Sequence, residues 1–68
     1  NNSIGAGTYS HTVDIGNGNP TGILFVIHGK RYSSHVDIPT GNGKLAIKTI
    51  RPTGELLRDW RTIDFTKD

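Results

Sequence analysis

Apolar and polar residues alternate with a period of two in three stretches of the chain, residues 8–15, 32–38 and 44–51. This period is typical of strands that bury one face. Between the first two stretches lies an unbroken apolar run, residues 23–27, which is rich in β-branched side chains and flanked by glycines. The run is too short for a free-standing helix. We expect it to be the most buried strand, with both of its faces covered.

Glycine, asparagine and proline mark the connections between these strands. Residues 16–22 hold three glycines, two asparagines and a proline, which predicts a long turn after the first strand. The Asn42-Gly43 pair is a strong hairpin signal between the third and fourth strands. The C-terminal end is ambiguous, because apolar residues within 56–60 have helical spacing while residues 59–65 alternate. We expect a final strand over 59–65, with a C-terminal helix as the competing interpretation.

These elements predict an all-β fold, a small antiparallel sandwich or barrel of about five strands. The chain has 68 residues, enough for one domain, and we assign residues 8–68 to that domain and residues 1–7 to a linker. A domain of this size has a thin core, and the absence of cysteine excludes disulfide bonds. We therefore expect association between subunits to supply the missing burial.

Composition and charge narrow the classes of function. Only 32% of the residues are hydrophobic. The longest apolar run is far shorter than the ~20 residues that a membrane helix needs, so we expect no membrane insertion. The net charge is +2, with basic and acidic residues interspersed. This distribution argues against a strongly basic surface for nucleic acid.

Three histidines and the aspartates near them are the candidates for metal binding or acid–base chemistry. His35 and Asp37 lie two residues apart, hence on one face of a strand, where a threefold axis would gather copies of them around a metal ion. The interpretation that we favour is an exposed polar strand face. The sequence has no nucleophile elbow, and one small sheet offers no walls for a pair of catalytic carboxylates. We expect no metal, no other cofactor and no enzymatic activity.

Basic and aromatic residues occur together in two places, Lys30-Arg31-Tyr32 and residues 58–61. A small SH3-like or OB-like barrel that binds nucleic acid would use such groupings. We keep this function as an alternative from another class. Trp60 has two interpretations, packing in a core or interface and a platform for a ligand.

The C-terminal half of the chain carries a further pattern. A strand that ends in an arginine, residues 45–51, is followed by the turn 52–54 and then by a tryptophan, a basic residue and an aliphatic residue within 59–63. In the N-terminal half, residues 7–9 begin the domain, and the apolar run after Gly22 forms its central strand. This pattern resembles the small knob domains at the tips of phage tail fibres and of the related pyocin fibres, over residues 7 to 65.

The resemblance implies a homotrimeric knob of a virion tail fibre or tailspike, joined to the shaft through residues 1–7. Such a domain attaches to a bacterial saccharide or protein receptor and is not an enzyme. Chains would bury apolar side chains such as Phe25 and Ile27 against each other. A saccharide site would combine an exposed aromatic ring with polar neighbours. The candidate ligand-binding residues are Trp60, Tyr32, His35, Arg58 and Arg61. A trimerisation or folding cap without receptor binding is the alternative within the same assembly.

Overall fold

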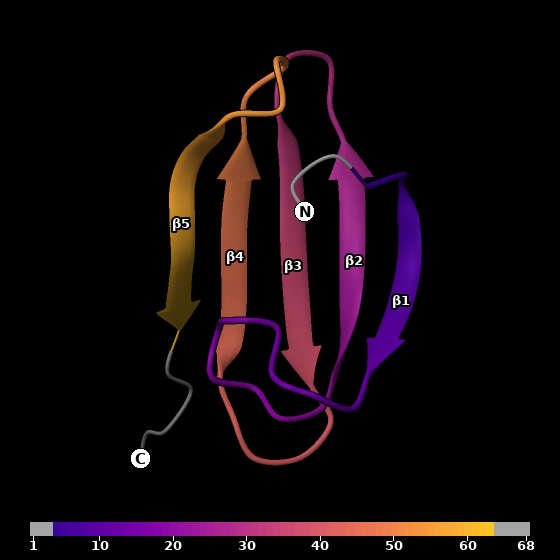
Figure 1. The fold of residues 1–68 in the computed structure, drawn as a ribbon, viewed down its shortest axis with the longest axis vertical. Coiled ribbons are helices and arrows are strands. Elements are labelled where there is room, and N and C mark those ends of the chain that lie inside the picture. The colour runs from indigo at the N-terminus through magenta and orange to yellow at the C-terminus, as the bar shows by residue number, and fades with distance from the viewer. Residues whose placement is uncertain (1–3, 64–68) are drawn as a thin grey trace.

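The computed structural model describes residues 4–63, and these form a single antiparallel sheet (Figure 1). The strands are β1 Gly7–His11, β2 Gly22–His28, β3 Ser33–Pro39, β4 Leu45–Ile50 and β5 Leu56–Ile63. Each strand pairs with its neighbours in the chain, so the order across the sheet is β1-β2-β3-β4-β5. The all-β class with five antiparallel strands is confirmed. Within this described part, no helix is long and apolar enough to cross a membrane.

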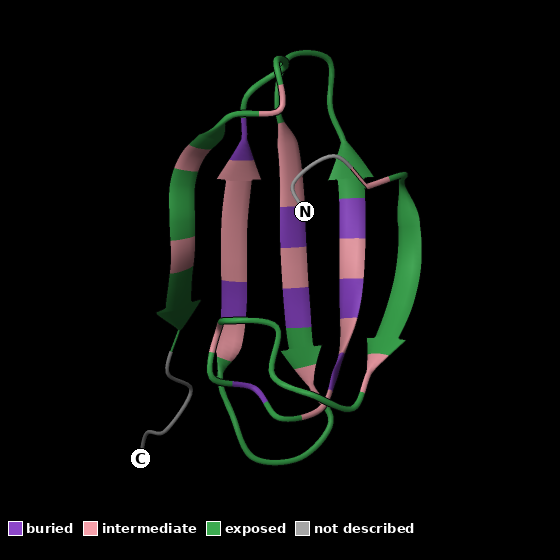
Figure 2. Cartoon of the chain, viewed as in Figure 1, coloured by how far each residue is buried: buried purple, intermediate pink, exposed green. Residues whose placement is uncertain are grey.

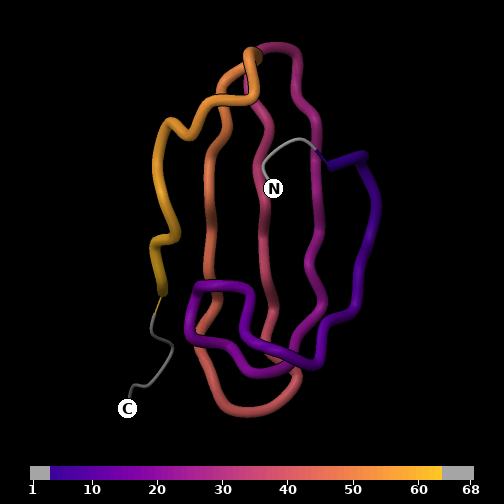
Figure 3. Tube along the Cα trace, viewed as in Figure 1, coloured from indigo at the N-terminus to yellow at the C-terminus, as the bar shows by residue number. Residues whose placement is uncertain are grey.

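The predicted sandwich or barrel is wrong for the single chain, because all five strands lie in one open sheet. β1 and β5 form its two edges and are not paired with each other (Figure 3). Three of the four connections are short turns, which keep consecutive strands adjacent. The one long connection, residues 12–21, folds over one face of the sheet instead of leading into a second sheet (Figures 1 and 3).

Local chemistry sets the strand boundaries at the two edges. β1 ends at His11, four residues before the predicted end, and the carboxylate of Asp14 then accepts hydrogen bonds from three backbone N–H groups of the loop. β5 begins at Leu56, three residues before the predicted start, which excludes the competing helix for this segment. Residues 64–65 of the predicted strand and residues 1–3 of the predicted linker lie outside the described residues.

The two faces of the sheet carry different side chains. Cross-strand partners share a face, so the pairing register assigns each residue to one side. We call one side the covered face, and its central residues are Leu24, Val26, His35, Asp37, Ala46 and Ile50. We call the other side the open face, and its apolar residues are Ile23, Phe25, Ile27, Val36, Ile38, Leu45, Ile47 and Ile63.

Burial is confined to the covered face. The loop 12–21 crosses this face near the end of β3 and the start of β4. Figure 2 shows the buried residues in β2, β3 and β4 and at one point of the loop. Leu24 and Val26 are only 9% and 3% exposed, whereas Ile27 on the open face is 56% exposed. The prediction that both faces of residues 23–27 are covered therefore holds for one face only, because residues 4–63 supply a covering loop to only one side.

Candidate functional site

The carboxylate of Asp37, in β3, is the centre of a polar network beneath the loop 12–21. Asp37 is fully buried. His11 Nε2 lies 2.8 and 2.9 Å from its two oxygens, and the side-chain amides of Asn17 and Asn19 donate to Oδ2 over 2.8 and 3.0 Å. A buried carboxylate is stable only when partners of this kind replace its water. The network therefore fastens the end of β1 and the loop to the centre of the sheet.

Asn19 extends the network to the next turn. Its side-chain amide also donates to the carbonyl oxygen of Lys44 over 2.9 Å, and its Oδ1 accepts a hydrogen bond from the backbone N–H of Lys44 over 2.9 Å. Asn19 is 1% exposed. One amide side chain thus satisfies both backbone groups of Lys44 and still reaches Asp37. The turn between β3 and β4 is held to the loop in this way.

At two positions, Gly22 and Gly43, the absence of a side chain makes room for the atoms of the network. A Cβ at Gly22 would lie 2.8 Å from Asp37 Oδ1 and 2.8 Å from His11 Nε2. A Cβ at Gly43 would overlap Oδ1 of Asn19. At each glycine the added Cβ would be closer to its neighbours than van der Waals contact allows. Neither position therefore accepts a side chain while the network is intact.

His11 is an imidazolium in this arrangement. Its Nδ1 lies 2.7 Å from the carbonyl oxygen of Val13, which can only accept, so Nδ1 carries a proton. Its Nε2 faces a carboxylate and must donate as well. Burial lowers the pKa of His11, but hydrogen bonds to Asp37 and Val13 and the charges of Asp37 and Asp14 outweigh that effect and raise the pKa above 6.5. His11 and Asp37 therefore form an ion pair.

Asp14 shapes the first part of the loop. Its Oδ1 accepts hydrogen bonds from the backbone N–H groups of Gly16, Asn17 and Gly18 over 2.7, 3.1 and 3.1 Å. The bonds from Gly16 and Gly18 are the main reason that the pKa of Asp14 lies below 3.8. The ionised carboxylate of Asp14 fixes the backbone around Asn17, and this places the Asn17 side chain within hydrogen-bond distance of Asp37.

Two of the predicted ligand-binding residues lie in one row of the covered face. His35 in β3 is in register with Lys48 in β4, and Lys48 Nζ lies 4.8 Å from the centroid of the Trp60 ring in β5. Trp60 is half-buried. His35 is only 2% exposed, and its Nε2 has no hydrogen-bond partner among residues 4–63. In this row, the Trp60 ring and the Lys48 ammonium are the groups that a ligand could contact.

The histidine of this row is held in its neutral form. Burial is the main reason that the pKa of His35 lies below 6.5, and the positive charge of Lys48 lowers it further. The two histidines of the covered face therefore differ in charge, since His11 is paired with a carboxylate and His35 is not.

The other three predicted ligand-binding residues lie elsewhere. Arg58 and Arg61 are exposed and pair in register with Thr49 and Ile47, which places them on the open face along β5. Tyr32 is 45% exposed in the turn between β2 and β3. The predicted residues therefore do not form one cluster, because Trp60 and the two arginines lie on opposite faces of the sheet. Their role as ligand-binding residues stays a prediction.

The pattern of the amino-acid sequence did not predict the network around Asp37. The prediction that His35 and Asp37 share a face is confirmed, but the interpretation of that face as exposed is wrong, since the two residues are 2% and 0% exposed. Asp37 can be buried because the loop supplies donors for its carboxylate from about 20 residues away. The available signal was the pair of asparagines in a loop that follows a histidine, which can supply donors to a buried acid.

The structure offers no metal site in its described part. Within residues 4–63 no three His, Asp or Glu side chains are grouped so that they could hold a metal ion. His11 and Asp37 satisfy each other, and the burial of both His35 and Asp37 prevents copies of them from meeting at a threefold axis.

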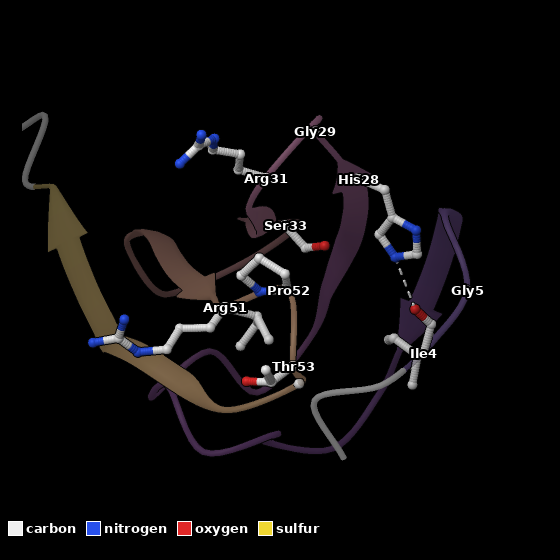
Figure 4. A pocket seen from close by; sticks show the side chains of 11 residues that line it. Ile4, Gly5, His28, Gly29, Arg31, Ser33, Arg51, Pro52 and Thr53 are labelled. Atoms are coloured by element: carbon white, nitrogen blue, oxygen red, sulfur yellow. Dashed lines mark hydrogen bonds between the residues drawn. The ribbon is translucent and has the colours of Figure 1, made fainter.

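An open pocket of about 490 Å³ lies at the far end of the sheet from the loop 12–21, between the turns that follow β2 and β4. Figure 4 shows the ring of His28 donating toward the carbonyl oxygen of Ile4, at 3.1 Å. The side chains of Arg31 and Arg51 point away from the pocket in this view. The pocket thus presents small polar groups and an apolar floor that includes Ile50, with its cations on the outside.

Comparison of the chain with models of known families, with curated proteins and with solved structures found no match. The geometry of this chain is therefore the basis for proposing its function.

Proposed function

We propose that this chain is a non-enzymatic receptor-binding domain at the tip of a phage tail fibre or tailspike, and that it works as a homotrimer attached to a bacterial surface component such as a saccharide. The observation that carries the proposal is the open face. It presents eight apolar side chains, and Ile27, Ile38 and Ile63 are 56%, 44% and 43% exposed. A bare apolar sheet of this kind is typical of a surface that packs against another chain.

The size of the open face fits an interface between subunits. The molecule measures 37 by 24 by 17 Å. A standard protein interface buries roughly 800 Å² on each partner, which is comparable with the broad side of the sheet. The largest apolar patch of an ordinary monomer is about 300–600 Å². Packing the open faces together supplies the burial that a 68-residue chain does not obtain alone.

Assembly through the open face leaves the covered face for the receptor. Trp60 with Lys48 then lies on the outside of the trimer, and Tyr32 lies at the end of the sheet. An aromatic ring with a nearby cation and hydrogen-bonding groups suits a saccharide. Three copies per particle increase a weak affinity through multivalency. Arg58 and Arg61 border the interface and contribute to its rim.

Light scattering on the purified chain at micromolar concentration tests the assembly. We expect a mass of three chains, and a strictly monomeric species would overturn the proposal. Ile27→Asp places a charge on the open face and should yield monomers. Val13→Asp is the matched control, because Val13 is 69% exposed in the loop and lies off the open face. This variant should remain a trimer.

Binding to host cells and to a glycan array tests the receptor function. We expect binding by the trimer and a loss of at least tenfold in Trp60→Ala with the trimer intact. An intact trimer that binds no cell or glycan would indicate the cap without receptor binding. Retention on nucleic acid that declines steeply with salt would instead favour the nucleic-acid alternative.

A further inference from the structure

The chain contains two Asn-Gly pairs, Asn17-Gly18 and Asn42-Gly43, both in connections between strands. In such a pair the backbone nitrogen of glycine can attack the side-chain carbonyl carbon of asparagine. A C–N bond forms, the bond to the side-chain nitrogen breaks and ammonia leaves, and water then opens the cyclic imide to aspartate or isoaspartate. Glycine favours the attack because it has no side chain to obstruct it.

All three groups that take part in this reaction are restrained at Asn17. Its Oδ1 accepts a hydrogen bond from the backbone N–H of Asn19 over 3.0 Å, and its Nδ2 donates to Asp37 over 2.8 Å. The attacking nitrogen, that of Gly18, donates to Asp14 over 3.1 Å. The carbonyl group, the leaving nitrogen and the nucleophile are therefore each held by a separate partner, and the reaction requires the loop to open first.

The second pair has no such restraint. Asn42 is exposed, and within residues 4–63 no hydrogen bond holds its side chain or the N–H of Gly43. Gly43 has a φ of +142°, a conformation that glycine adopts with ease. The side chain of Asn42 is thus free to rotate toward the glycine nitrogen.

We propose that Asn42 is a site of spontaneous deamidation and that the Asp37 network protects Asn17 from the same reaction. Each event consumes one water, releases one ammonia and lowers the net charge of +2 by one unit. The product matters because Lys44, two residues on, holds Asn19 through both its backbone groups. An isoaspartate at position 42 adds a main-chain atom beside this contact and should weaken it.

Peptide mapping by mass spectrometry, with separation of aspartate and isoaspartate, tests the proposal on the full chain after incubation at mildly alkaline pH. We expect modification at Asn42 and at least about tenfold slower modification at Asn17, as a locally closed segment requires. In concentrated urea the two sites should react at similar rates. Equal rates in the native chain, or an Asn42 that reacts only in urea, would overturn the proposal.

The variant Asp14→Ala tests whether the hydrogen bond to Asp14 protects Asn17 from deamidation. Asp14→Ala releases the N–H of Gly18 without removing a buried group, so the reaction at Asn17 should accelerate severalfold while that at Asn42 keeps its rate. Glu55→Ala, which removes an exposed carboxylate far from both pairs, is the matched control and should change neither rate. An unchanged rate at Asn17 in Asp14→Ala would contradict the restraint that we assign to Asp14.

Discussion

The covered face and the open face of this sheet are stabilised by different kinds of interaction. The covered face buries Asp37, His35 and Asn19, and directional hydrogen bonds from a loop of the same chain satisfy Asp37. The open face carries aliphatic and aromatic side chains, and nothing within residues 4–63 covers it. The difference is that the loop of the same chain covers one face and satisfies its buried carboxylate, whereas the apolar side chains of the other face have no such cover within residues 4–63. Non-directional apolar contacts suit packing between identical surfaces.

The largest expected effect comes from removing the acid of the covered face. Asp37→Ala leaves the partly buried His11 cation and the side-chain amides of Asn17 and Asn19 without their acceptor. Breaking a buried ion pair on one side costs about 3–5 kcal/mol, which should unfold most of a domain this small. Urea denaturation measures the loss. Glu55→Ala is the control and should change the free energy of unfolding by no more than about 0.5 kcal/mol.

A smaller loss should follow from filling the space beside the ion pair. Gly22→Ala puts a Cβ 2.8 Å from Asp37 Oδ1 and His11 Nε2 and 2.9 Å from the carbonyl oxygen of Ile38. Overpacking of this kind costs about 1–3 kcal/mol. Gly5→Ala is the matched control, since its nearest neighbour would lie at an ordinary 3.7 Å. Equal stability of the two variants by urea denaturation would contradict the tight packing described here.

The pH dependence of stability separates the two histidines of the covered face. The pKa of His11 is raised in the folded chain, so its contribution is complete below 6.5 and is lost as the pH rises through the folded value. The pKa of His35 is lowered, so the folded state resists its protonation and stability is lost as the pH falls below 6.5. Stability should therefore decline on both sides of pH 6.5.

Single substitutions assign the two flanks of this profile. His11→Gln should flatten the alkaline flank, and His35→Gln should flatten the acid flank, in urea denaturation repeated across pH. A profile in which His11→Gln changes only the acid flank would contradict the ion pair with Asp37.

The smallest expected effect concerns the contact between Lys48 and Trp60. Lys48→Gln removes the cation that lies 4.8 Å from the ring centroid, a contact worth about 0.5–1 kcal/mol at an exposed site. The same change removes a charge that lowers the pKa of His35, so an NMR titration of His35 should move to higher pH. Lys30→Gln, in the exposed turn after β2, should leave both values unchanged.

The sequence was informative where local rules decide the structure. Alternation and turn residues predicted β2, β3 and β4 closely, because hairpin geometry depends on neighbouring residues. The burial of Asp37 could not be predicted in this way, because it depends on donors from a loop that is distant in the sequence. Two register shifts in β5 also change which side chains share a face, so alternation does not predict that Trp60 and Arg58 lie on opposite sides.

The Asp37 network also has a consequence for the lifetime of the folded chain. The bonds from His11 and Asn19 join residues that are 26 and 25 positions apart, farther than any pair of strand partners in the β2–β3 and β3–β4 hairpins. Contacts between distant residues close large loops of chain, and their entropic cost delays them until the local hairpins are in place. We therefore expect the network to form after the folding transition state, and interactions of this kind slow unfolding more than they speed folding. A substitution that releases the loop 12–21 should then raise the unfolding rate more than it lowers the folding rate.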